Sequence, residues 1–246
     1  MAFDELWHGG PKFKQSENSF RLSTDSVLLG DFARPKRGCR CLDLGSGAGV
    51  LSILLAAKCE SASVVGIELQ PDFAELSHEN LRENSLEKRI EIICGDLREH
   101  RALFLPESFD LVVSNPPYFP QNSGFSAPAE SRALAREEID CTLEDVCAAA
   151  RWLLRWGGDF AMVHRPERLS EILCTMTSVG IEPKRLRMVH YSPERPPSLV
   201  LIEGKRGAAS GIFFESPLIL TAPCGSESDE VQRIYKRGKF SPDKEA

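Results

Sequence analysis

The chain has 246 residues, of which 42% are hydrophobic and 27% charged, and this is enough apolar material for one full core, so we expect a single α/β domain. The formal net charge of −6 argues against a protein that coats nucleic acid non-specifically, although a local basic face is compatible with it. Because the eight cysteines include no Cys-x-x-Cys pair and no apolar run approaches the ~20 residues of a membrane span, we expect a cytoplasmic protein with no metal site and no membrane association.

The predicted elements begin with an N-terminal segment, residues 1–38, that we expect to cap the rest of the domain. Ser23 or Asp25 is suited to begin a helix as its N-cap, and the apolar residues that follow at 27–29 would pack inward. We expect residues 39–240 to form the core of the same domain and residues 241–246 to be a flexible tail.

Four apolar runs rich in Val, Ile and Leu follow, and helix-forming segments separate them. We predict strands at residues 40–44, 64–68, 90–94 and 110–114, and helices at 50–58 and 71–84. Strands that alternate with helices in this way are typical of a parallel sheet, because each crossover helix returns the chain to the same end of the sheet.

The second half of the chain starts with residues 118–141, which show no clean period, and a loop of this length is usually functional or disordered. The remaining predicted elements are a helix from Thr142 to Gly157-Gly158, a strand at 159–163, a helix at 166–179 and strands at 187–190 and 199–203. A short proline-containing connection joins the last two strands and favours an antiparallel pair. We therefore predict an α/β fold with a mostly parallel seven-stranded sheet, a C-terminal antiparallel hairpin and helices on both faces.

A glycine-rich turn, Asp43-Leu44-Gly45-Ser46-Gly47-Ala48-Gly49, lies between the first predicted strand and its helix. Glycines at this place permit a sharp turn and the close approach of a ligand. The dinucleotide-binding pattern Gly-x-Gly-x-x-Gly would need its third glycine at position 50, where this chain has Val50. An ordinary tight turn is the alternative, and this motif alone does not decide between a turn and a ligand site.

Three further polar motifs follow the second, third and fourth predicted strands. Glu68 ends the second strand, where a carboxylate can accept both hydroxyls of a ribose, and Asp96 follows the third. Asn115-Pro116-Pro117-Tyr118 follows the fourth strand, and its two prolines give a stiff exit with free carbonyl groups. A solvated strand end or a turn explains each motif alone. Together with the glycine turn they favour a ligand site, because all four fall at the carboxyl ends of parallel strands.

The glycine turn resembles motif I of the class I S-adenosylmethionine-dependent methyltransferases, which have a Rossmann-like fold. The resemblance implies that S-adenosylmethionine is the cofactor and that the turn backs onto its methionine part. It also implies that Glu68 binds the ribose and that Asp96 accepts from the adenine amine. The cofactor-binding residues implied in this way are Thr24, Asp25, Asp43, Gly45, Gly47, Gly49, Glu68, Asp96, Leu97 and Asn115.

Asn-Pro-Pro-Tyr resembles motif IV of methyltransferases that act on amino groups conjugated to a π system, which implies Asn115, Pro116, Pro117 and Tyr118 as catalytic residues. The lone pair of such a nitrogen is delocalised. Acceptance of its N–H bonds by the Asn115 side chain and the Pro116 carbonyl would favour the pyramidal nitrogen of the transition state. Tyr118 would stack on the acceptor, a contact worth ~1–3 kcal/mol for a base. No strong general base is needed, and we assign none to the five histidines.

Residues 20–30, which contain Thr24-Asp25, look like a segment of the valine-tRNA adenine-N6 methyltransferases, and the likeness extends over nearly the whole chain. It implies methylation of adenine N6 in tRNA, at an anticodon-loop adenosine. Glu137 stands where we would expect a histidine in relatives, which leaves the role of its loop open. The alternatives are a glutamine side chain of a release-factor-type protein, another amino group of RNA or DNA, and a non-catalytic binding protein. A partner protein or a homodimer also stays open.

An RNA substrate needs cations despite the negative total charge. The C-terminal part of the chain supplies cations that could line a phosphate-facing rim, namely Lys184, Arg185, Arg187, Lys205, Arg206, Arg233, Lys236, Arg237 and Lys239. Acids such as Glu182, Glu203 and Glu230 occur in the same region, so scattered solvated charges are an equally good interpretation.

Overall fold

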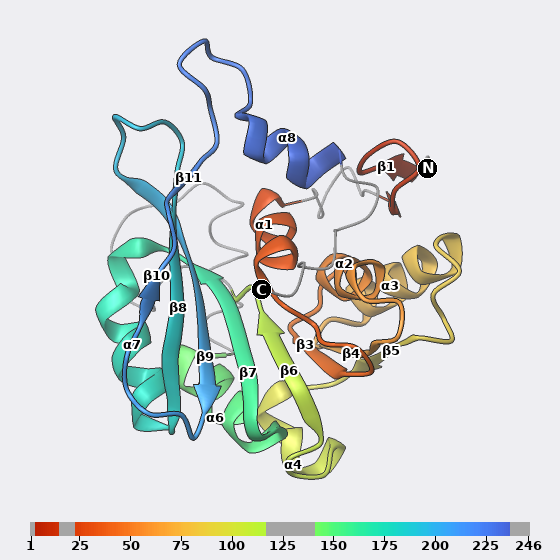
Figure 1. Ribbon diagram of the computed structural model, residues 1–246. Coiled ribbons are helices and arrows are strands. Elements are labelled where there is room, and N and C mark those ends of the chain that lie inside the picture. The colour runs from red at the N-terminus through yellow and green to blue at the C-terminus, as the bar shows by residue number, and fades with distance from the viewer. Residues whose placement is uncertain (1–2, 15–22, 117–140, 237–246) are drawn as a thin grey trace, which may run out of the picture.

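The computed structural model describes residues 3–14, 23–116 and 141–236, and Figure 1 shows one large sheet with helices on both of its faces. The strands are β1 (Phe3–Glu5), β2 (Lys12–Lys14), β3 (Arg40–Leu44), β4 (Ser63–Glu68), β5 (Ile90–Cys94), β6 (Phe109–Ser114), β7 (Leu154–His164), β8 (Ile181–His190), β9 (Pro197–Arg206), β10 (Phe213–Phe214) and β11 (Leu218–Ile219). The helices are α1 (Thr24–Phe32), α2 (Val50–Lys58), α3 (Pro71–Glu83), α4 (His100–Leu103), α6 (Leu143–Leu153), α7 (Leu169–Ser178) and α8 (Asp229–Lys236), with short 3-10 turns η1 (Leu97–Glu99) and η2 (Pro166–Arg168).

The large sheet has nine strands in the order β10-β8-β9-β7-β6-β3-β4-β5, with β11 also paired to β8. Neighbouring strands are parallel except at β9, which runs antiparallel to both β7 and β8. The predicted α/β fold class, with its mostly parallel sheet and C-terminal antiparallel pair, is confirmed. The predicted number of strands was too low, because β10 and β11 have two residues each and are too short to show a period.

The carboxyl ends of β3, β4, β5, β6, β7 and β8 share one edge of the sheet, at the top of the view in Figure 1. We call it the carboxyl edge, and its strand ends are Leu44, Glu68, Cys94, Ser114, His164 and His190. β3 and β6 are neighbours in the sheet, so the glycine turn after β3 and the Asn-Pro motif after β6 start from adjacent strands. β8 lies three strands away from β6, on the other side from β3.

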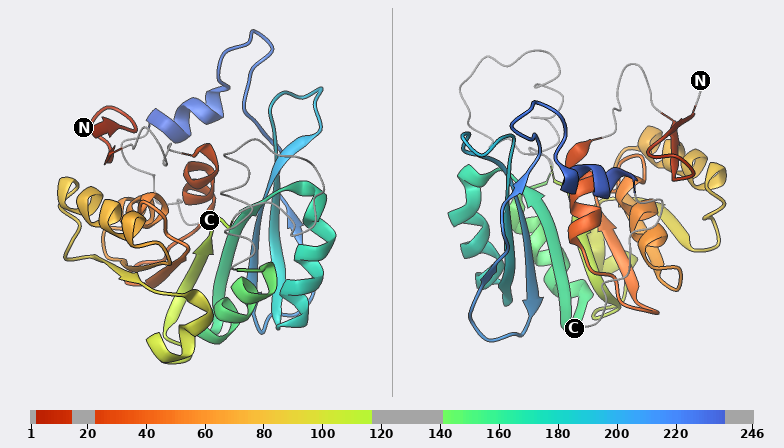
Figure 2. Two further views of the ribbon diagram at one scale, coloured as in Figure 1. Left: turned by 180° about the vertical axis from the view of Figure 1, so that it is seen from behind. Right: turned by 45° about the horizontal axis from the view of Figure 1, so that its top comes forward.

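Helices α1, α2 and α3 pack on one face of the sheet together with α8, and α6 and α7 pack on the other (Figure 2). Successive strand residues alternate between the two faces. Val113 and Val163 belong to the core under α1 to α3, whereas Val112 and Met162 belong to the core under α6 and α7. Within the described ranges, no helix is both long and apolar enough to cross a membrane.

The prediction that the helix starting at Thr142 continues to Gly157-Gly158 was wrong. Thr142 does begin it with a capping box, but α6 ends at Leu153, and β7 starts at the next residue, Leu154, which pairs with β6. The two glycines lie inside the strand beside a register shift, with Gly157 at φ +74°. Pairing with β6 therefore overrides the local helix propensity of this segment.

The C-terminal hairpin is longer than predicted, because β8 starts at Ile181 and β9 at Pro197. Pro183 is tolerated inside β8 because the pairing of β8 with β9 shifts register between Pro183 and Arg185. The turn between the two strands keeps them antiparallel, as predicted.

The N-terminal segment contains α1, whose N-cap is Ser23, since its side chain accepts a hydrogen bond from the Asp25 N–H (3.1 Å). An unpredicted hairpin of β1 and β2 precedes it and docks on α3. The Asn80 side-chain oxygen accepts from the Lys14 N–H (2.8 Å). The Asn84 amide accepts from the Lys12 N–H (2.9 Å) and donates to the Lys12 carbonyl (2.7 Å). The expected tail at 241–246 lies outside the described residues.

Candidate functional site

The glycine turn between β3 and α2 adopts the left-handed conformation at three glycines. Gly45, Gly47 and Gly49 have φ values of +74°, +54° and +79°, a region that side-chain-bearing residues rarely adopt. The N–H groups of Gly45 and Ser46 both donate to the Ile67 carbonyl of β4 at 3.0 Å, which fixes the turn to the sheet. A Cβ atom added at Gly45 or Gly47 would meet nothing within 4 Å, so open space lies beside the turn.

Helix α3 supports the glycine turn through two side-chain hydrogen bonds. The Ser77 hydroxyl donates to the Gly47 carbonyl (2.7 Å), and the Asn80 amide donates to the Ala48 carbonyl (2.9 Å). Ser77 and Asn80 are fully buried. A Cβ atom at Gly49 would lie 2.9 Å from the Ser77 hydroxyl, so glycine is required there by close packing as well as by its φ angle. Asn80 thus contacts the glycine turn with one end of its amide and the N-terminal hairpin with the other.

Glu68, at the end of β4, is almost fully buried beside the turn. One carboxylate oxygen accepts from the Gly47 N–H (2.8 Å) and the other from the Gln70 N–H (2.9 Å). Each oxygen retains a second lone pair, so the carboxylate can also accept from the hydroxyls of a ligand. The predicted ribose-binding acid therefore lies directly against the predicted cofactor turn.

Asp43 is deeply buried, and its carboxylate accepts a hydrogen bond from the Ser52 hydroxyl of α2 (2.7 Å). Burial raises the pKa of Asp43 to about 7, against the lowering effect of Ser52 and with a further raising effect of the Glu68 charge. The Asp43 carboxylate therefore faces α2, and its predicted contact with the cofactor stays a prediction.

No ion pair joins Asp43 or Glu68 to a lysine or arginine among the described residues, and their bonds come from neutral donors. The Glu68 carboxylate, which has no cationic partner in the described part of the chain and lies beside the open space at the turn, suits a ligand that carries positive charge and ribose hydroxyls. S-adenosylmethionine, with its sulfonium and amino groups, has this chemistry. In the same described ranges, no group of three or more His, Cys, Asp or Glu side chains is arranged to hold a metal ion.

Asp96 and Leu97 lie just beyond the end of β5, where the sequence placed the adenine site. Asp96 is the N-cap of η1 and accepts from the Arg98 N–H (2.9 Å). The Arg98 guanidinium also binds both of its oxygens and lowers the pKa of this carboxyl. Half-buried Leu97 packs against the core under α6. The proposed contact of Asp96 with adenine stays a prediction, and Arg98 competes for the same oxygens.

Asn115 and Pro116 follow β6 and are half-buried. The Asn115 amide donates to the Ser26 hydroxyl of α1 (3.0 Å), which fixes the orientation of the side chain. Ser114 donates to the Leu44 carbonyl at the end of β3 (2.9 Å), so the ends of β3 and β6 are tied together. Pro117 and Tyr118, the other two predicted catalytic residues, lie outside the described residues, as does Glu137.

Thr24 and Asp25, the predicted cofactor contacts of the N-terminal segment, form the first turn of α1. Helix α8 packs against α1, and Tyr235 of α8 is hydrogen-bonded to Thr24. Burial raises the pKa of Tyr235, and this bond partly opposes the rise. Thr24, Asp25 and Ser26 therefore lie between the end of β6 and the C-terminal helix.

His164 ends β7 on the same edge and is buried. Its Nδ1 accepts from the Arg165 N–H (2.7 Å), and burial, followed by the positive charge of Arg168, lowers its pKa to about 4. It is therefore neutral at physiological pH.

Sequence reasoning missed four residues that position the site: Ser26, Ser52, Ser77 and Asn80. The last two had a signal. Small polar residues at 77, 80 and 84 lie three and four positions apart, so they share one face of the predicted helix. Polar residues on an inward helix face need partners, and here the partners are the glycine turn and the N-terminal hairpin.

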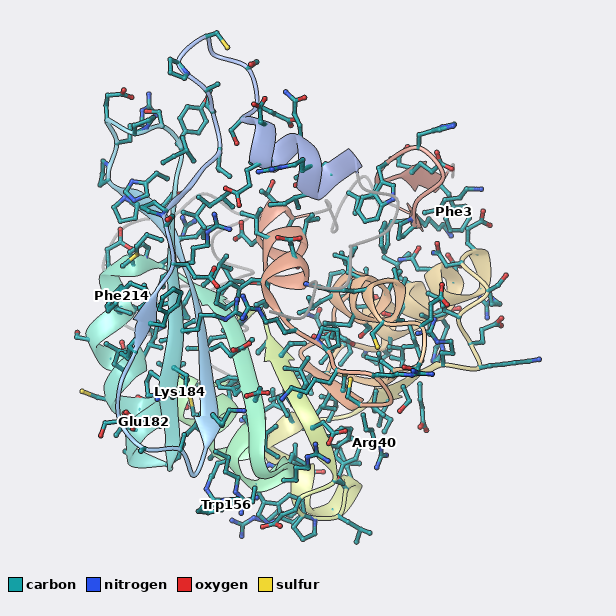
Figure 3. All side chains as sticks on the ribbon, in the orientation of Figure 1. Phe3, Arg40, Trp156, Glu182, Lys184 and Phe214 are labelled. Carbon is teal, nitrogen blue, oxygen red and sulfur yellow. The ribbon has the colours of Figure 1, made fainter. Side chains whose placement is uncertain are left out.

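Most of the cations predicted to form a phosphate-facing rim are engaged elsewhere. The ion pairs are Arg185 with Glu203 and Glu215, Arg187 with Glu230, Lys205 with Asp159, and Arg206 with Glu107. Lys184 donates to the Ala209 carbonyl and lies near the lower end of β8 in Figure 3, away from the carboxyl edge. Arg233 is exposed on α8. The Lys236 side chain and residues Arg237 and Lys239 lie outside the described part.

Residues 23–176 match the family model for the methyltransferase small domain. A tRNA1(Val) (adenine(37)-N6)-methyltransferase of Porphyromonas gingivalis is 32% identical over 228 residues, 89% of each chain. Proteins of the same name from Bacteroides fragilis and Aeromonas hydrophila are 31% and 33% identical and cover 80% and 83% of this chain, and 79% and 90% of their own.

Solved structures confirm the fold. A predicted O-methyltransferase from Agrobacterium tumefaciens superposes with a TM-score of 0.71 at 24% identity, over 86% of this chain and 95% of its own. A geranyl diphosphate C-methyltransferase from Streptomyces coelicolor, solved with S-adenosyl-L-homocysteine, gives 0.54 at 13% identity, over 74% of this chain and 78% of its own. The chain therefore belongs to the methyltransferase small domain family, among the S-adenosylmethionine-dependent tRNA1(Val) (adenine(37)-N6)-methyltransferases.

Proposed function

We propose that this methyltransferase transfers a methyl group to adenine N6 in tRNA, at an anticodon-loop adenosine of a valine-type tRNA. The observation that carries the proposal is the position of Asn115, held by Ser26 at the end of β6, directly beside the glycine turn of the neighbouring strand β3. Neighbouring strands lie ~4.8 Å apart, so the amine-binding group and the cofactor turn lie within the length of one small ligand. The relatives named above act on this nucleotide according to their names.

The residues of the chain have separate tasks in this proposal. Bound S-adenosylmethionine supplies a methyl group on a positively charged sulfur. Gly45 and Gly47 leave space beside which it would lie, and Glu68, which accepts from the Gly47 N–H, would also accept from its ribose hydroxyls. The Asn115 side-chain oxygen and the Pro116 carbonyl accept the two N–H bonds of the adenine amine, which favours the pyramidal nitrogen from which the methyl group is attacked. The product loses its proton to water, so no histidine is required.

We place the enzyme in the cytoplasm. All eight cysteines carry free thiols, including Cys39 and Cys41, whose sulfur atoms lie 3.4 Å apart at hydrogen-bond distance and form no disulfide. This is the expected state in a reducing compartment, where tRNA is also found.

The test is a labelled-methyl assay on total tRNA and, separately, on total protein. Label in tRNA supports the proposal, whereas label in protein alone contradicts it and favours a glutamine side chain as the acceptor. Asn115→Ala is expected to abolish transfer and to leave the cofactor dissociation constant within a few-fold. Ser26→Ala, which removes only the bond that orients Asn115, is expected to lower kcat partially. Equal loss of cofactor binding and transfer in Asn115→Ala would mean that Asn115 mainly supports the cofactor.

A further inference from the structure

The turn between β8 and β9, residues 191–196, presents an exposed aromatic side chain at the carboxyl edge. Tyr191 is 51% exposed, and the Arg195 guanidinium carbon lies 4.9 Å from the centre of its ring. The other exposed Trp, Tyr or Phe side chains of the described ranges are Trp156, Phe213 and Phe214. Figure 3 shows Trp156 at the lower end of the sheet and Phe214 on the outer strand, so neither lies on the edge that carries the site.

The backbone of this turn is held in place although its side chains are exposed. The Arg195 N–H donates to the Ser192 carbonyl (3.1 Å), and the Arg195 carbonyl contacts His190 Nδ1 at 2.8 Å. The Tyr191 carbonyl accepts from the Thr221 N–H (2.8 Å), which ties the turn to the segment after β11. Tyr191 and Arg195 therefore face solvent from a fixed position, and binding a ligand there orders little backbone.

The turn lies on the side of β6 that is opposite to the cofactor turn, where the nucleotide that accepts the methyl group would enter. β8 is separated from β6 by β9 and β7, so at ~4.8 Å per strand β8 lies about 14 Å to the side of β6, which ends just before Asn115. The cofactor turn after β3 lies on the opposite side of β6. The pairing register places Leu186 of β8 level with Ser114, so Tyr191 also lies beyond the end of β6 along the strand direction. A ligand that reaches both Asn115 and Tyr191 must therefore extend over more than about 14 Å, which a chain of a few nucleotides does, whereas a single base does not.

We propose that Tyr191 and Arg195 bind the RNA next to its target nucleotide, with a splayed base stacked on Tyr191 and an adjacent phosphate bound by Arg195. The inference rests on the proposed function. Single-stranded RNA loops are recognised by stacking on aromatic side chains and arginine, and this pair supplies both. Glu194 in the same turn offsets the charge of Arg195, so the contact depends on stacking and on one phosphate more than on general attraction. General attraction for RNA is also limited because four other cations of this region form ion pairs within the protein, namely Arg185, Arg187, Lys205 and Arg206.

The experiment measures methylation kinetics and equilibrium binding with an unmodified valine tRNA transcript, and calorimetry with S-adenosylmethionine alone. Tyr191→Ala is expected to raise KM and the dissociation constant for tRNA by about tenfold, with kcat and cofactor affinity unchanged. Tyr191→Phe, which keeps the ring, is expected to behave like the wild type. Arg195→Gln is expected to weaken binding and to reduce the slope of log affinity against log salt by about 0.7, the value for one phosphate of a single strand.

Matched controls separate this contact from general effects. Phe214→Ala removes an exposed aromatic away from the carboxyl edge, and Arg101→Gln removes an exposed cation on α4; both are expected to leave tRNA binding unchanged. A KM for tRNA within twofold of the wild type in Tyr191→Ala would overturn the inference while the proposed function stands. If the wild type methylates protein and no tRNA, the proposed function and this inference fall together.

Discussion

Asn80 joins the N-terminal hairpin to the cofactor turn, and Asn80→Ala is expected to weaken both stability and cofactor binding. The substitution removes the bonds to the Ala48 carbonyl (2.9 Å) and to the Lys14 N–H (2.8 Å). The first bond is buried, so its orphaned carbonyl costs ~1–3 kcal/mol, and the second is partly buried and costs ~0.5–1.5 kcal/mol. We expect the free energy of unfolding to fall by about 2–3 kcal/mol and the cofactor dissociation constant to rise roughly five- to tenfold.

Two neighbouring substitutions separate the two effects. Ser77→Ala removes a bond to the glycine turn only, and Asn84→Ala removes the bonds of α3 to Lys12 of the hairpin. Urea unfolding and calorimetric titration with S-adenosylmethionine measure stability and affinity for each variant. We expect Ser77→Ala to lower affinity and Asn84→Ala to lower stability with a smaller effect on affinity. Unchanged cofactor affinity in both Asn80→Ala and Ser77→Ala would refute the reasoning that α3 shapes the cofactor site.

Two further predictions concern the same turn. Burial raises the pKa of Asp43 to about 7, so the native state binds this proton more tightly than the unfolded chain, and stability should fall as pH rises from about 4 to about 7, by up to roughly 4 kcal/mol. Urea unfolding at pH 5 and pH 8 should show roughly 2.7 kcal/mol of this loss in the wild type and a smaller loss in Asp43→Asn; equal losses would contradict it. Gly49→Ala combines a φ of +79° with a Cβ 2.9 Å from a hydroxyl of α3, whereas Gly9→Ala has a φ of +73° and open space. Thermal unfolding should therefore show a larger loss in Gly49→Ala than the ~1–2 kcal/mol of backbone strain expected for Gly9→Ala, and similar losses would argue against the close contact.

The middle of the fold was predictable because its strands are buried on both faces. β3, β4 and β6 are rich in buried Val, Leu and Ile, and such segments stand out from the helices between them. Because these strands are parallel, the polar residues that follow them all lie at the carboxyl edge of the sheet. The start of β7 was not predictable from local sequence, because Leu154 continues a helical pattern and only its pairing with β6 makes it a strand.

The positioning residues of the site depend on contacts between distant parts of the chain. In the sequence Ser26 has no feature that separates it from other helix residues. Its role follows only from the fold, in which the end of β6 places Asn115 beside it. Asp96 was assigned to adenine from its place after β5, but the sequence did not reveal that Arg98, two positions on, would bind both of its oxygens. Such bonds follow from the three-dimensional arrangement, and a periodic pattern carries no information about them.

The contact between α8 and α1 has a consequence for how the enzyme matures. Thr24 is among the first described residues to leave the ribosome, and Tyr235 is among the last, so their hydrogen bond joins segments separated by nearly the whole chain. Contacts of such long sequence separation form late in folding, because the loop between them must first be ordered. The first turn of α1 therefore makes its native contacts with α8 only after α8 has been synthesised. A chain shortened before α8 would lack the helix that packs against Thr24.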